Sequence, residues 1–230
     1  MNDHTPPLEL WIQDVQSYLY KVLRVSMEPA GFKFDKDNYS FHRKFGKNIQ
    51  EFGFFFINQF PLNYRVSFVL QIRNKTVREM KSSFFDHIQK TNFRLSSMVI
   101  FLNDFMREMP YMEPVRDFIL YTNNDLFQAG DSIARILRER ALPLCDELTS
   151  IADIDNYFSH HPCWSVNTLN LDNIVSELIV ARLNAKREYE ELYLQLASAL
   201  DKKIDDKLID PSSREVIQSC YSYFKRKILA

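Results

Sequence analysis

The sequence of 230 residues contains only four glycines, and Gly31, Gly46, Gly53 and Gly130 are isolated from one another. Loops that cradle phosphate need clustered glycines, which let backbone N–H groups approach the ligand. The sequence has no P-loop, no dinucleotide-binding fingerprint and no Gly-x-Ser-x-Gly nucleophile elbow. These absences argue against the common nucleotide-binding folds, and we expect no cofactor.

Cysteine is also scarce, and no apolar run is long. Cys145, Cys163 and Cys220 form an odd, irregularly spaced set, which indicates a reducing compartment instead of a disulfide framework. The apolar runs at 53–57 and 98–102 are far shorter than the roughly 20 residues that span a bilayer. The first 25 residues lack the basic and apolar regions of a signal peptide. We therefore expect a cytoplasmic protein that does not bind membranes.

Charge is nearly balanced overall but uneven along the chain. The net charge is −1, while residues 31–90 carry eleven Lys and Arg against five Asp and Glu, a local charge of +6. Residues 131–172 carry three against seven, a local charge of −4. Charge blocks of this size usually solvate surfaces or pair internally, so they indicate no specific class of partner.

Aromatic and branched side chains recur at every second position between residues 39 and 72, which predicts three consecutive antiparallel strands. The residues in phase are Tyr39, Phe41, Arg43, Phe45, Phe52, Phe54, Phe56, Tyr64, Val66, Phe68, Leu70 and Ile72. Because this period places alternate side chains on one face, we expect the rings to form a core and the intervening residues to face solvent. Turns are predicted at 35–38, 46–48 and 61–63, and further short strands at 32–34, 97–102 and 118–121.

Helical periodicity dominates the rest of the chain, with a first helix over residues 8–23 and another over 76–90. Capping boxes are predicted at Thr76/Glu79, Thr122/Asp125, Ser150/Asp153 and Ser212/Glu215. The predicted fold class is α+β, with an antiparallel β-meander of three to five strands packed with helices and a helical C-terminal third. We expect one structural domain, in which residues 1–165 form the α+β part and residues 166–230 form a helical C-terminal extension packed on it. The best candidate for a boundary is the loop at 162–171. The first helix and the 76–90 helix are expected to cover one face of the sheet.

The densest cluster of metal-ligating residue types is His160, His161 and Cys163. Adjacent residues on a helix point about 100° apart, so the two histidines do not readily share one ion. The cluster has no CxxC or HxxxH partner, and Pro162 is typical of a helix end. We therefore predict a helix terminus and no metal site, with these three residues kept as candidates.

A second set of candidates lies on the predicted strands. Glu51 is on the face opposite the rings, and in a plausible register it stands opposite His42 and Lys44, with Arg43 between them in the sequence. A half-buried carboxylate with a raised pKa can act as a general acid, so these four residues define an alternative function as a small hydrolase or nuclease-like enzyme. The simpler interpretation is a cross-strand ion pair.

The predicted solvent face of the strands is itself apolar at its centre, where Phe55, Ile57 and Val69 lie. Something must cover such a surface: the C-terminal helices, a protein partner, a second subunit or a ligand. Basic residues interleave with aromatic ones in this region, but they point to opposite faces, so we do not expect nucleic acid to bind. The leading prediction is a non-enzymatic cytoplasmic interaction or ligand-binding module.

Three stretches also carry a family resemblance: residues 29–33, with a Gly-Phe-Lys junction, residues 41–44, with an F-x-R strand, and the aromatic strand at 50–55. In this order they resemble the opening of an uncharacterised bacterial domain-of-unknown-function family. The Ala-Leu-Pro-Leu junction at 141–144, followed by Ser150 and Ile154, resembles a later part of the same family. The resemblance covers roughly residues 20–160. It implies an α+β fold and supplies no catalytic residues.

Overall fold

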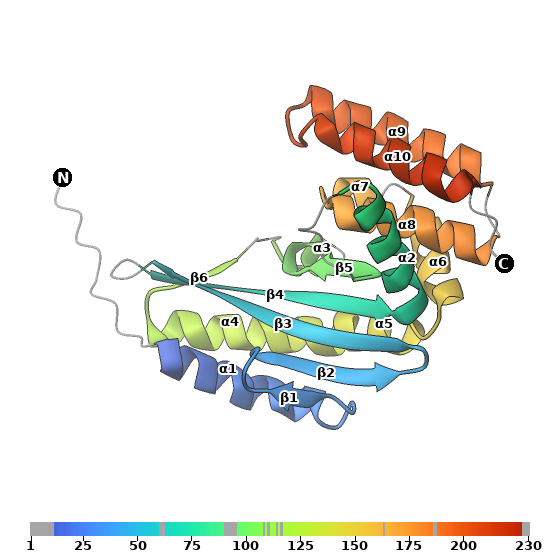
Figure 1. Ribbon diagram of the computed structural model, residues 1–230. Coiled ribbons are helices and arrows are strands. Elements are labelled where there is room, and N and C mark those ends of the chain that lie inside the picture. The colour runs from blue at the N-terminus through green and yellow to red at the C-terminus, as the bar shows by residue number, and fades with distance from the viewer. Residues whose placement is uncertain are drawn as a thin grey trace, which may run out of the picture. The chain divides into compact units, whose positions relative to one another are not determined.

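The computed structural model describes residues 12–59, 63–89, 96–107, 109, 111–113, 115, 117–162, 164–185 and 188–226. The first part of the chain contains all six strands together with α1, α2 and α3, and helices alone follow β6 (Figure 1). The strands are β1 (Lys33–Asp35), β2 (Ser40–Phe45), β3 (Asn48–Gln59), β4 (Asn63–Asn74), β5 (Met98–Phe101) and β6 (Phe118–Leu120). The helices are α1 (Ile12–Met27), α2 (Lys75–His87), α3 (Leu102–Arg107), α4 (Asn123–Ile136), the π-helix η1 (Leu137–Ala141), α5 (Leu142–Glu147), α6 (Ile151–His160), α7 (Trp164–Asn167), α8 (Leu171–Asn184), α9 (Tyr189–Asp205) and α10 (Ser212–Arg226).

The strands form one sheet of six, and the predicted α+β class is confirmed. The order is β1-β2-β3-β4-β5, and β6 pairs with β4. The two pairings with a defined register are antiparallel, and they set Lys33 opposite His42 and Arg65 opposite Ile119. No described helix is both long and apolar enough to cross a bilayer.

Contacts divide the chain into two compact units. Unit 1 comprises Met1–Lys44, Gln50–Leu70 and Ile100–Asp146, and unit 2 comprises Phe45–Ile49, Gln71–Val99 and Glu147–Ala230. The boundary expected at residues 165/166 therefore falls inside unit 2, because α8 packs against both α6 and α7.

The core of unit 1 contains the aromatic side chains that the period of two selects. Phe41, Phe52 and Phe68 are fully buried, and the ring of Phe68 lies 6.0 Å from that of Phe52. Tyr20 of α1 stacks 6.1 Å from Phe41, so α1 covers this face of the sheet. The alternation thus predicts the buried face correctly at the centre of the strands. It is wrong for Phe45, which is 36% exposed at the end of β2.

Helix α4 packs beside α1 in unit 1, whereas the sequence assigns this place to the 76–90 helix. That helix is α2, and it packs on α8 in unit 2. Its N-cap is Asn74, not Thr76, because the Asn74 side chain accepts hydrogen bonds from the Thr76 and Val77 amides. Strand and helix therefore follow one another without an intervening turn. The boxes at Thr122/Asp125 and Ser150/Asp153 are confirmed.

The expected break at Pro143 takes the form of the π-helix η1 directly before α5. Proline has no N–H and its ring crowds the preceding turn, and a wider turn relieves both constraints. A further correction concerns the loop expected at 162–171, which contains the short helix α7. Thr5, Pro6 and Leu8, placed at the start of the first predicted helix, lie outside the described residues.

Helix α8 is the centre of unit 2, where α2, α6, α7, α9 and α10 pack against it. Its residues are buried without a gap from Asn173 to Ala181. A helix surrounded on all sides must place its polar groups against partners, and Asn173 does so by bonding both the amide and the carbonyl of Val99.

Lys81 of α2 is fully buried in unit 2, and its ammonium group has four acceptors. Nζ donates to the Ser96 carbonyl at 2.9 Å, to Asp172 Oδ1 at 3.0 Å, to the Asp172 carbonyl at 3.2 Å and to Ser176 Oγ at 3.1 Å. Burial lowers the pKa of Lys81, and the Asp172 carboxylate opposes this shift. The buried charge ties α2, residue 96 and α8 together.

Replacing Lys81 tests this role. Lys81→Met keeps the length of the side chain but leaves the mostly buried Asp172 carboxylate without its cation, so we expect the free energy of unfolding to fall by about 3 kcal/mol. The control is Lys75→Met on the same helix, whose exposed pair with Glu79 should be worth less than about 0.5 kcal/mol. Urea denaturation measures both. Equal effects of the two variants would contradict the assignment.

Candidate functional site

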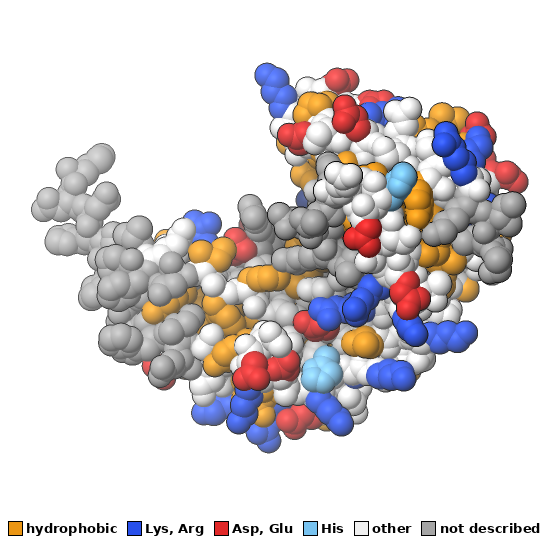
Figure 2. Space-filling model, viewed as in Figure 1, with side chains coloured by type: hydrophobic (Ala, Val, Ile, Leu, Met, Phe, Trp, Pro, Cys, Tyr) orange, Lys and Arg blue, Asp and Glu red, His pale blue; other side chains and the backbone are white. Residues whose placement is uncertain are grey.

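The face of the sheet opposite the aromatic core of unit 1 carries exposed apolar side chains. Phe55 and Ile57 on β3 are 38% and 45% exposed, and Ile119 on β6 is 44% exposed. In the view of Figure 2, hydrophobic side chains are visible over β3, β4 and β6. We call Phe55, Ile57 and Ile119, with the side chains of β3 and β4 between them, the open sheet face.

The register between β3 and β4 places these residues relative to one another. Phe68 lies between Phe52 and Phe54, at ring distances of 6.0 and 6.4 Å. A Cβ on Gly53 would lie 3.7 Å from Cγ1 of Val69. Both observations set Gly53 opposite Val69, and the antiparallel register then sets Phe55 opposite Ser67 and Ile57 opposite Arg65.

Ile119 comes next, since it pairs with Arg65. The open sheet face therefore contains one apolar stripe across β3 and β6, interrupted by Arg65. Val69, a candidate from the sequence, lies beside Gly53 on the same face but is fully buried, so it is not part of the exposed surface. Ile119 was missed by the sequence analysis, although alternation within the strand predicted at 118–121 places it opposite the buried Leu120.

Among the candidate catalytic residues of the hydrolase alternative, Arg43 lies apart from the others. Arg43 is buried on the ring side of β2, and alternation turns His42 and Lys44 the other way. Its Nε donates to Gln50 Oε1 at 2.7 Å, Nη1 donates to the Ala30 carbonyl at 2.6 Å and Nη2 donates to Asp146 Oδ1 at 2.5 Å.

The guanidinium of Arg43 also lies 4.5 Å from the centre of the Phe32 ring. Gln50 in turn donates to the Cys145 carbonyl. Arg43 thus joins the junction after α1 to β3 and α5, which are segments that carry the family resemblance. The structure supports a role for this arginine in holding unit 1 together.

The histidine cluster also has local partners. Nδ1 of His160 is 2.8 Å from the Asn156 carbonyl, and Nδ1 of His161 is 2.8 Å from the Tyr157 carbonyl, one turn earlier in α6. The His161 ring stacks on Tyr157 at 4.2 Å. Cys163 lies outside the described residues. Within the described ranges, no group of three His, Cys, Asp or Glu residues is placed to hold a metal ion.

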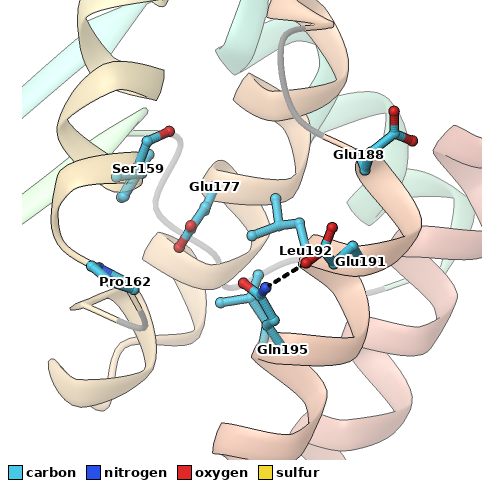
Figure 3. Close-up of a pocket in the computed structure, with 9 residues that line it drawn as sticks. Ser159, Pro162, Glu177, Glu188, Glu191, Leu192 and Gln195 are labelled. Atoms are coloured by element: carbon cyan, nitrogen blue, oxygen red, sulfur yellow. Dashed lines mark hydrogen bonds between the residues drawn. The ribbon is translucent and has the colours of Figure 1, made fainter.

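Unit 2 contains an acidic cavity of about 230 Å³ between the end of α6, α8 and α9. Glu177, which is buried, points into it from α8, and Glu188 and Glu191 come from the start of α9 (Figure 3). Ser165 donates to Glu177 Oε2 at 2.5 Å, and Gln195 donates to Glu191 at 3.2 Å. This lining favours a cation over an anion. In the sequence, the only indication of this cavity is the single glutamate Glu177 within the apolar run of α8.

Two buried thiols complete the set of reactive groups. Cys145 and Cys220 are free and buried. Burial raises the pKa of the Cys220 thiol far above its ordinary value, and the nearby Lys81 ammonium only partly opposes this shift. A thiol held in its protonated form is a poor nucleophile. We therefore assign Cys220 to the core of unit 2.

Comparison with protein-family models, with curated proteins and with solved structures finds no match to this chain. Its function is therefore inferred from the geometry of the described residues.

The contacts of Arg43 predict its effect on stability. Arg43→Leu leaves the carbonyl of Ala30 and the side chain of Gln50 without this donor, so we expect the free energy of unfolding to fall by about 3 kcal/mol. Asp146→Asn is the control, because Asp146 is largely exposed and its loss should cost less than about 1 kcal/mol. Chemical denaturation of both variants is the measurement, and an Arg43→Leu protein as stable as Asp146→Asn would refute this role.

The thiol of Cys220 predicts a dependence on pH. Its pKa is raised by folding, so its contribution to stability is complete below the ordinary value of 9.0 and is lost as pH rises above it. We expect the difference in unfolding free energy between the wild type and Cys220→Ala to be constant from about pH 7 to 8.5. Above about pH 9 it should fall by about 1.4 kcal/mol per unit. Denaturation at a series of pH values measures it, and a difference that stays constant up to about pH 10 would contradict the assignment of a buried, protonated thiol.

Proposed function

We propose that the chain is a non-enzymatic protein-interaction module, and that the open sheet face is its docking surface. The observation that supports this proposal most directly is the exposure of Phe55, Ile57 and Ile119 on neighbouring strands of unit 1. Large apolar side chains that lie together on a rigid sheet usually mark an interaction site. We place the module in a bacterial cytoplasm, in line with its free thiols and its family resemblance.

A protein surface suits the open sheet face better than a small molecule does. Small ligands bind in concave sites that enclose most of their surface. The open sheet face is built from side chains that stand side by side on strands, and none of Phe55, Ile57 and Ile119 lines the acidic cavity of unit 2. A broad partner with an apolar centre would cover all three at once.

The contacts of the candidate catalytic and metal-ligating residues also favour a binding role over a hydrolase. Arg43 is engaged by three acceptors, and His160 and His161 contact their own helix. Catalysis by Glu51, His42, Arg43 and Lys44 requires their convergence in one pocket, and Arg43 is on the other side of the strand.

Site-specific photocrosslinking tests the proposal. A benzophenone amino acid at Ile57 should give a protein adduct of one defined mass in cells, whereas the same group at Val25, which is exposed on α1, should not. The captured protein is then purified and titrated. Phe55→Ser with Ile57→Ser should weaken its binding at least about tenfold relative to Val25→Ser, because the apolar contact is lost. An adduct pattern at Ile57 no stronger than at Val25 would refute the docking surface.

A further inference from the structure

We draw no further inference here: the strongest candidate, the acidic cavity between α6, α8 and α9 in unit 2, carries none, because its buried member Glu177 already accepts a hydrogen bond from Ser165 and no second feature of the described residues points to a ligand for this cluster of carboxylates.

Discussion

A cation buried in a protein interior needs hydrogen-bond acceptors for its N–H groups. This requirement determines which segments pack together around one buried cation in each of the two units. In unit 1 the guanidinium of Arg43 donates to a backbone carbonyl, a side-chain amide and a carboxylate that come from three separate segments. In unit 2 the ammonium of Lys81 is satisfied by two carbonyls, a carboxylate and a hydroxyl. Each charge is costly to bury, and each is tolerable only when every segment is in place. A misplaced segment would leave a buried charge without an acceptor, so both cations favour the correctly assembled fold.

This commitment of polar groups to internal contacts shapes the functional interpretation. Arg43 and the two histidines of α6 contact groups of the chain itself, and Cys145 and Cys220 are buried. Apolar side chains of β3 and β6, in contrast, remain partly in water, where they contribute little to the stability of the fold. Exposed apolar side chains lower solubility and add little stability, so their presence is best explained by the binding of a partner.

Local patterns in the sequence predicted a large part of the fold. Alternation places Phe41, Phe52 and Phe68 in the core, and the capping boxes at Thr122 and Ser150 begin real helices. The failures concern information that is not local. Asn74 replaces Thr76 as a cap because the strand runs directly into the helix, and α2 packs on α8 because of a buried lysine whose partners lie up to 95 residues away. The same holds for the site: alternation predicts Phe55 and Ile57 on the open sheet face, but the burial of Val69 depends on contacts that alternation does not encode.

The proposed function requires that a protein partner cover the open sheet face in the functional complex. Hydroxyl-radical footprinting measures this directly, because it reports the solvent exposure of individual side chains without any substitution. As the partner captured at Ile57 is added, oxidation of Phe55, Ile57 and Ile119 should fall severalfold while that of Val25 on α1 stays constant. Equal oxidation of these side chains under all conditions would contradict the proposed role of this face.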